Sequence, residues 1–494
     1  MKPAWRRALM RLMLAVVGAA ALAIGLNGCF GAPGYQGAKS AHFDGQEFYN
    51  TPRLTLPGLG KMLRWQLSGK SIPWPADGVE KPQAKPEALA PKGMIRATFV
   101  NHATVLLQVG ELNVLTDPVW SERVGPLSWL GPKRHRSPGI AFEDLPRIDA
   151  VLISHSHYDH CDAPTLRRLQ QAFHPKIFAG LGTAAMLAEH GINNVTDLDW
   201  WQTAMLLSPS GQRFEVKFGP AQHWSNRSMS DVNTVLWGSF GLQGGGASVY
   251  FAGDTGWGPH FDAIRAAWGA PDLALLPIGA YEPRWFMHPQ HMGPDQAVVA
   301  HQALGARRSM AIHWLTFDQS DEGQYQPAGE LGVALGAAHI PPDNFLALEN
   351  GEVMDVALGG SAPAPLIEAP RKLAQIGARH QRIGMMLGMV RETKRKHRQP
   401  PTAPSPRDHT WRQAAITMGE VHGEEWRQPS ANKHQYAVAK EARMLLTKPP
   451  CACHGAADQK QIADEPKPCA RMAMTPRPEP KPWQILRPCE QRAP

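Results

Sequence analysis

The chain has 494 residues, and 51 Lys and Arg against 43 Asp and Glu give it a net charge of +8. The positive charge is concentrated after residue 370, where Lys and Arg outnumber Asp and Glu about two to one, so the preceding part is mildly acidic. Such basic runs are usually solvated, and nucleic acid is therefore not expected as a partner. The sequence has no internal repeat and no nucleotide-binding glycine loop, which argues against repeat arrays and P-loop enzymes.

The first 28 residues predict an export signal, because a basic start precedes an apolar stretch, residues 12–24, that is too short to span a bilayer. The string Leu26-Asn27-Gly28-Cys29 resembles a lipobox, which implies cleavage before Cys29 and lipidation of that cysteine, as in bacterial lipoproteins. Phe30, the residue after Cys29, is not acidic, so it does not match the signal that retains lipoproteins in the inner membrane. We therefore expect a lipid-anchored protein of the bacterial cell envelope, on the periplasmic face of the outer membrane, that contacts the membrane surface through its anchor.

Composition divides the rest of the chain into three parts. Residues 29–91 are a Pro- and Gly-rich lead-in segment, and residues 92–358 alternate apolar and turn-forming stretches as a folded domain does. Residues 359–494 are basic and Pro-rich, and we expect them to be mostly disordered because they lack sustained apolar periodicity. The domain holds one cysteine, Cys161, so its core is expected to need no disulfide.

Strands and helices alternate along the domain. Apolar or alternating runs predict strands at 104–109, 112–116, 150–154, 176–179, 214–218, 249–252, 273–277 and 310–312, and helices at 164–173, 183–189 and 294–304. This alternation indicates the α/β class. By itself it does not distinguish a two-sheet sandwich from a doubly wound sheet.

Three histidines and an aspartate follow the strand predicted at 150–154, in the string Ser154-His155-Ser156-His157-Tyr158-Asp159-His160. Alternate residues of an extended chain point to the same side, so His155 and His157 can hold one cation. Asp159 and His160 lie in the turn before the next helix and point toward a second position. Imidazole and carboxylate groups are zinc ligands, and the string offers more of them than one ion uses. The sequence therefore predicts a two-metal site.

Three downstream residues, His223, Asp254 and His313, are candidates for the rest of the ligand set. Each follows a predicted strand, and the carboxyl ends of strands are where α/β sheets place their chemistry. A carboxylate such as Asp254 can bridge two cations. Asp117, at the end of another strand, is either an acceptor for a ligand imidazole N–H or a turn residue before Pro118.

The metal-ligand pattern resembles the metallo-β-lactamase superfamily, whose members carry H-x-H-x-D-H followed by a distant His, a bridging Asp and a last His. Five longer strings are similar, more narrowly, to the family of N-acylphosphatidylethanolamine-hydrolysing phospholipase D and its bacterial lipoprotein relatives. These strings are Thr116-Asp117-Pro118, Gln222-His223-Trp224, residues 251–256, residues 277–287 and Ala311-Ile312-His313-Trp314.

The resemblance implies a four-layer αβ/βα sandwich with its site at the edge of the two sheets. It also implies two Zn²⁺, with Mn²⁺ or Fe²⁺ as alternatives, and catalytic roles for two of the ligands, Asp159 and Asp254. The ligands of the first zinc are expected to be His155, His157 and His223, those of the second Asp159, His160 and His313, and the bridge Asp254. The expected phospholipid contacts are Tyr158, Gln290 and His291.

The implied activity is a phosphodiesterase that cleaves N-acylphosphatidylethanolamine-like phospholipids to phosphatidate and an N-acylethanolamine. One alternative keeps the metals and opens a lactone or another ester, and a second is a non-catalytic envelope lipoprotein. A homodimer is possible. The segment 120–138 carries Trp129 and Leu130 with Lys133, Arg134 and Arg136 behind them, which suits a bilayer interface, although a loop folded onto the domain has the same pattern.

Overall fold

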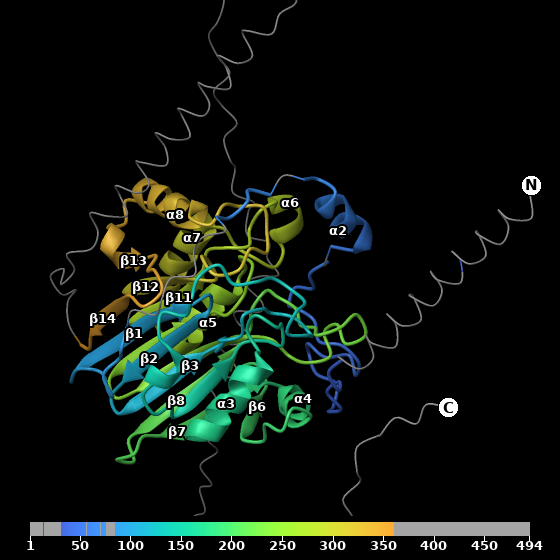
Figure 1. Ribbon diagram of the computed structural model, residues 1–494. Helices are drawn as coiled ribbons and strands as arrows, with labels where there is room; N and C mark the ends of the chain where they lie inside the picture. Colours follow the sequence, from blue (N-terminus) through green and yellow to red (C-terminus); the bar gives the residue numbers. More distant parts are fainter. Residues whose placement is uncertain (1–12, 14–30, 56, 70, 76–83, 360–494) are drawn as a thin grey trace, which may run out of the picture. The chain divides into compact units, whose positions relative to one another are not determined.

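The structure is a computed structural model that describes residues 13, 31–55, 57–69, 71–75 and 84–359 (Figure 1). All of the expected export signal except Met13, the lipidation site at Cys29 and nearly all of the expected tail lie outside the described residues. Among the described residues, no helix is both long enough and apolar enough to cross a membrane.

The first sheet has seven strands in the order β14-β1-β2-β3-β4-β5-β6. The strands β3 to β6 run parallel to one another, whereas β14, β1, β2 and β3 pair antiparallel. Their bounds are β1 (Met94–Asn101), β2 (Thr104–Val109), β3 (Leu112–Thr116), β4 (Ala150–Ile153), β5 (Lys176–Gly180), β6 (Val195–Leu198) and β14 (Val353–Ala357).

The second sheet also has seven strands, in the order β13-β12-β11-β10-β9-β8-β7. Here β7 to β10 pair antiparallel and β10 to β13 pair parallel. Their bounds are β7 (Thr203–Leu207), β8 (Arg213–Gly219), β9 (Ser239–Gly244), β10 (Ala247–Phe251), β11 (Leu273–Pro277), β12 (Arg308–Ile312) and β13 (Phe345–Leu346).

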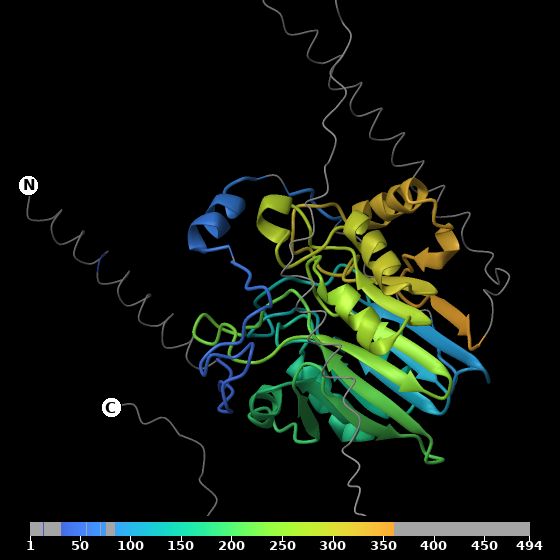
Figure 2. The same cartoon turned by 180° about the vertical axis from the view of Figure 1, so that it is seen from behind.

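Helices cover the outer faces of both sheets (Figures 1 and 2). Along β2, Val105 and Leu107 point into a core shared with the second sheet, while Leu106 points to the opposite face. That outer face is covered by α3 (Ala163–Phe173) and α4 (Thr183–Ala188), and the outer face of the second sheet by α5 (His260–Trp268) and α7 (Pro294–Leu304). The predicted four-layer αβ/βα sandwich is thus confirmed.

The remaining helices are short or lie at the edge of the sandwich. They are α2 (Leu59–Gln66), α6 (Arg284–Met287), α8 (Gln326–Ala337) and two 3₁₀ turns, η1 (Phe142–Asp144) and η2 (Pro342–Asn344). Trp65 of α2 stacks on Phe286 of α6 with ring centroids 5.0 Å apart, so the lead-in segment reaches the far side of the molecule from α3 and α4.

Candidate metal centre

Five loops from both sheets meet at one edge of the sandwich. His102 lies in the turn between β1 and β2, and residues 155–160 follow β4. His223, Asp254 and His313 follow β8, β10 and β12, respectively. His102 and His313 both adopt a positive φ, which is uncommon outside glycine and concentrates at functional sites. The backbone N–H of His313 donates to the His102 carbonyl at 2.8 Å, so this hydrogen bond joins the two sheets at the site.

Three imidazoles converge at what we call the first subsite, formed by His155, His157 and His223. The Nδ1 atom of His157 lies 2.8 Å from Nε2 of His155 and 3.3 Å from Nε2 of His223. Burial lowers the pKa of all three rings, that of His157 to about 4, so they are neutral at neutral pH. Nδ1 of His223 donates to the Gln290 carbonyl at 3.0 Å, which leaves the lone pair of Nε2 directed at its neighbours. Converging lone pairs fit a cation.

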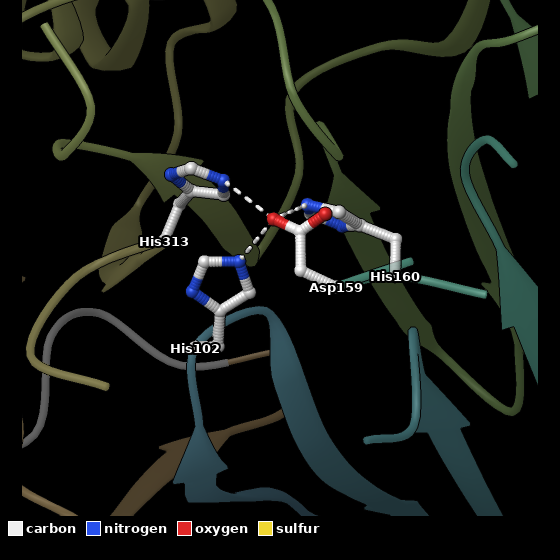
Figure 3. A group of neighbouring side chains, drawn as sticks. All are labelled: His102, Asp159, His160 and His313. Carbon is white, nitrogen blue, oxygen red and sulfur yellow. Dashed lines mark hydrogen bonds and ion pairs between the residues drawn. The ribbon is translucent and has the colours of Figure 1, made fainter. Parts of the chain in front are cut away.

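The second subsite consists of Asp159, His160 and His313. Nε2 of His160 lies 3.3 Å from Asp159 Oδ2 and 3.2 Å from Asp254 Oδ2, and Nε2 of His313 lies 3.7 and 2.9 Å from the same two atoms. Ligand atoms about 2.0–2.1 Å from a tetrahedral zinc are roughly 3.3 Å from one another. The spacing within this cluster therefore fits one bound ion (Figure 3).

Asp254 connects the two subsites. Its Oδ2 atom lies 4.0 Å from His155 Nε2 and 3.8 Å from His223 Nε2, in addition to its contacts with His160 and His313. Burial opposes ionisation of Asp254, but His160 and His313 outweigh it and hold its pKa well below the usual range. Its Oδ1 atom is buried and has no hydrogen-bond partner among the described residues. A buried carboxylate oxygen without a donor is costly unless a cation takes the place of that donor, and the donor set therefore fits two divalent metal ions.

Asp117 binds residues at both ends of the H-x-H-x-D-H motif through hydrogen bonds. It accepts hydrogen bonds from His160 Nδ1 at 2.7 Å, from the Ser154 backbone N–H at 2.7 Å and from Ser154 Oγ at 2.5 Å. The predicted hydrogen bond from an imidazole N–H of the motif to Asp117 is thus confirmed. Cys161 is fully buried, as predicted for a small core residue, and burial raises the pKa of its thiol to about 11.

His102 belongs to the site although the sequence did not indicate it. Its Nε2 atom lies 3.0 Å from Asp159 Oδ2 (Figure 3). Gln319 Nε2 donates to the same oxygen at 3.1 Å. Burial lowers the pKa of His102 to about 3, so its ring is neutral and can donate from Nε2. Its one sequence signal is that it follows β1, a strand that was not predicted from the sequence.

The three expected phospholipid contacts lie in different settings. His291 is near both subsites, with its ring centroid 5.1 Å from that of His223 and 5.4 Å from that of His313, and its buried Nδ1 has no hydrogen-bond partner among the described residues. The Tyr158 hydroxyl donates to the Arg227 carbonyl at 3.0 Å, and the Arg227 guanidinium covers its ring. The side chain of Gln290 is buried, and its backbone carbonyl is the group that contacts a site residue, His223.

A cavity of about 480 Å³ adjoins the second subsite. Gln319, which donates to Asp159, is one of its lining residues, together with Trp65 from α2 and the carboxylates of Asp318 and Asp321. A cavity of about 570 Å³ lies at the opposite end of β4 and is bordered by Asp149, so it is remote from the metal-ligand cluster.

The segment 120–138 divides into an exposed tip and a buried base. Trp129 and Leu130 are 70% and 45% exposed. Arg134 is buried, where it donates to the carbonyls of Ser121 and Val119. Arg136 is also buried. The apolar tip therefore faces solvent, which is one of the two alternatives that the sequence left open, whereas Arg134 and Arg136 are buried and do not lie behind the tip as surface charge.

Comparisons with known proteins agree with this geometry. Residues 112–314 match the family model described as a beta-lactamase superfamily domain. The chain is 38% identical over 271 residues to N-acyl-phosphatidylethanolamine-hydrolyzing phospholipase D 1 of Caenorhabditis elegans, an alignment that covers 53% of this chain and 76% of the relative. It is 32% identical over 258 residues to the mitochondrial N-acyl-phosphatidylethanolamine-hydrolyzing phospholipase D of Saccharomyces cerevisiae. This second alignment covers 52% of this chain and 55% of the yeast protein.

A third relative, the outer membrane protein RomA of Klebsiella pneumoniae, is 36% identical over 105 residues, which is 21% of this chain and 77% of the relative. One assignment follows from the ligand pattern, the two mixed sheets and the extent of the match to the nematode protein. The chain belongs to the metallo-β-lactamase superfamily of metal-dependent hydrolases, and within it resembles N-acylphosphatidylethanolamine-hydrolysing phospholipase D.

Proposed function

We propose that the protein is a zinc-dependent phosphodiesterase of the phospholipase D type, which cleaves N-acylphosphatidylethanolamine or a similar phospholipid to phosphatidate and an N-acylethanolamine. The observation that carries the proposal is the position of Asp254 Oδ2, within 4.0 Å of nitrogens from both subsites, in a chain whose relatives are named for this reaction.

The ligand assignment follows the two subsites. His155, His157 and His223 would hold one zinc ion and Asp159, His160 and His313 the other, with Asp254 shared between them. Imidazole and carboxylate donors suit zinc. When bound, two such cations supply Lewis-acid activation of a water and neutralise charge on the phosphoryl oxygens.

Asp159 is proposed to orient the attacking water and to accept its proton. Burial opposes ionisation of this carboxyl, but His160 and His102 hold its pKa well below the usual range, so it is available as a base at neutral pH. Hydrogen bonds from His102 and Gln319 fix the carboxylate in one orientation, and a fixed base lowers the entropy cost of the attack.

Three residues are proposed to hold the phosphodiester. His291 is well placed, because its unpartnered Nδ1 atom lies 3.9 Å from Asp254 Oδ2, at the junction of the subsites. Tyr158 would contact the phosphate by exchanging its hydrogen bond to the Arg227 carbonyl for one to the substrate. Gln290 would contribute by donating from the Nε2 group of its side-chain amide to a phosphoryl oxygen.

A location at the cell envelope would bring the protein close to a phospholipid substrate. The RomA relative is named as an outer membrane protein, and lipidation is expected at Cys29. The backbone N–H of Ala32, three residues after Cys29 in the sequence, donates to Asp231 at 2.6 Å. Asp231 also accepts from the backbone N–H of Arg227, whose guanidinium donates to two carbonyls of the metal-binding loop. The anchor would thus hold this side of the site near the membrane.

The proposal is tested with the full-length protein loaded with zinc and three substrates: N-acylphosphatidylethanolamine, bis(p-nitrophenyl) phosphate and a sugar lactone. The expected result is cleavage of both phosphodiesters, with turnover abolished in Asp254→Asn, because the amide keeps the shape of the bridge and loses its charge. Inert phosphodiesters together with rapid lactone opening would overturn the choice of substrate. No turnover of any of the three substrates would favour a non-catalytic envelope lipoprotein.

A further inference from the structure

The lead-in segment is packed into the domain from residue 31 to residue 50. Phe43 and Phe48 are each 1% exposed and belong to the main core. The backbone N–H groups of Tyr35 and Phe48 donate to the carbonyls of Thr234 and Asn233 at 2.9 and 2.8 Å. These contacts lead the chain across the loop that follows β8 and bring Asn50 beside the first subsite.

Asn50 is bonded to both backbone polar groups of His223. Its Nδ2 atom donates to the His223 carbonyl at 2.7 Å, and its Oδ1 atom accepts from the His223 backbone N–H at 3.1 Å. The same oxygen accepts from Trp237 Nε1 at 3.2 Å, and the side chain is only 5% exposed. Every polar atom of the amide group is therefore directed at a defined partner.

His223 has little other support for its backbone. It lies in the loop after β8, outside the strand ladders, and among the described residues it makes no backbone–backbone hydrogen bond. Its ring is oriented by the Gln290 carbonyl, which accepts from Nδ1. Asn50 therefore fixes where the main chain places this imidazole, and Gln290 fixes which nitrogen faces the metal-ligand cluster.

We propose that Asn50 is a positioning residue of the first subsite, and that the segment 31–50 is part of the metal centre rather than a linker. The proposal rests on His223 being a metal ligand, as proposed above. The second subsite has its own supports, namely Asp117 behind His160 and the pair His102 and Gln319 beside Asp159. Loss of Asn50 should therefore weaken the first subsite selectively.

The test measures zinc bound per chain while full-length, zinc-loaded protein is dialysed against increasing concentrations of dipicolinate. In Asn50→Ala one of the two zinc ions should be released at an about ten- to hundred-fold lower chelator concentration than in the wild type, the range found when groups that orient metal ligands are removed. The other zinc ion should be released at the wild-type concentration. A general loss of stability would instead lower the chelator concentration at which both zinc ions are released.

His42→Ala is the matched control. His42 lies in the same segment, pairs with Asp199 at 2.7 Å and stacks on Trp200, but touches no proposed ligand, so this variant should release both ions as the wild type does. Asn50→Asp provides a second variant of nearly unchanged volume, in case Asn50→Ala does not fold. It keeps the acceptor for His223 N–H but sets a carboxylate oxygen against the His223 carbonyl, so it should also release one zinc ion early.

His223→Ala separates the two proposals. If His223→Ala loses one zinc ion while a folded Asn50 variant keeps both at the wild-type chelator concentration, the role of Asn50 is rejected and the metal centre stands. If His223→Ala itself keeps both ions with wild-type affinity, the ligand assignment is wrong, and the inference about Asn50 fails with it.

Discussion

His160 donates from Nδ1 to Asp117 over 2.7 Å, and the same ring presents Nε2 to Asp254 at 3.2 Å. The buried carboxylate of Asp117 therefore determines both the tautomer and the direction of a proposed ligand. Ser154, which precedes His155, is held by the same carboxylate through its backbone N–H and its hydroxyl. One residue directly after β3 thus orients the start and the end of the H-x-H-x-D-H motif.

Replacement of Asp117 by Asn should weaken metal binding by about ten- to hundred-fold, because a neutral amide is a poorer acceptor for the His160 N–H. Chelator titration of zinc content measures this directly. Asp149→Asn is the control, since Asp149 lies at the other end of β4 and accepts from the Asn113 backbone N–H, away from the cluster. Equal zinc retention in the two variants would show that Asp117 does not orient His160.

His102→Ala should lower kcat by about ten-fold or more with a smaller change in KM, because Asp159 loses a donor that fixes its orientation. Gln319→Ala should act in the same direction through the same oxygen. Steady-state kinetics with N-acylphosphatidylethanolamine measures both variants. An unchanged kcat in His102→Ala, with zinc content equal to that of the wild type, would mean that the His102–Asp159 contact has no part in turnover.

The exposed tip at Trp129 and Leu130 should contribute to membrane binding. In a Cys29→Ser background, which removes the expected lipid, Trp129→Ala with Leu130→Ala should reduce co-sedimentation with anionic phospholipid vesicles, because apolar side chains insert at the interface. Met205→Ala with Leu207→Ala is the matched control, since these side chains on β7 are 46% and 52% exposed. Equal binding by both double variants would assign no membrane role to the tip.

His260 should make the folded state sensitive to acid. Burial lowers its pKa to about 3, below the 6.5 of the unfolded chain, so the unfolded state binds the extra proton and stability falls as pH drops below 6.5. Between pH 7.5 and 5.0 this amounts to about 2 kcal/mol. Denaturant unfolding of wild type and His260→Phe at both pH values should show a smaller loss in the variant. An equal loss would mean that His260 titrates normally.

Much of the fold was readable because its strands are fully buried. The strands 104–109, 112–116 and 273–277 have the predicted bounds, since every residue in them is buried and apolar runs end at turn residues. The helix 294–304 also has the predicted bounds, with Pro294 in its first turn and Gly305 as a left-handed cap. By contrast, α8 contains Gly329, Gly332 and Gly336, and the glycines obscured a helix that is held by packing against α7.

The proposed ligands were found because four of them form one string after a predicted strand, and the other three each come within a few residues of the end of another predicted strand, where α/β sheets place their chemistry. The residues that orient them were harder to find. Asn50 and His223 are 173 positions apart, and Gln319 and Asp159 are 160 apart. A hydrogen bond over such a separation leaves no local pattern, and a lone Asn or Gln has no metal-ligand signature. His102 follows β1, which was not predicted as a strand, so it gave no comparable signal.

The most direct test of the central claim is hydrolysis of N-acylphosphatidylethanolamine by the full-length, zinc-loaded protein in ¹⁸O-labelled water, with both products identified by mass spectrometry. Attack of water on phosphorus, with the N-acylethanolamine as the leaving group, predicts one ¹⁸O in phosphatidate, none in the N-acylethanolamine, and no products from Asp254→Asn. Label in the N-acylethanolamine, release of a fatty acid instead, or an intact lipid would contradict the account.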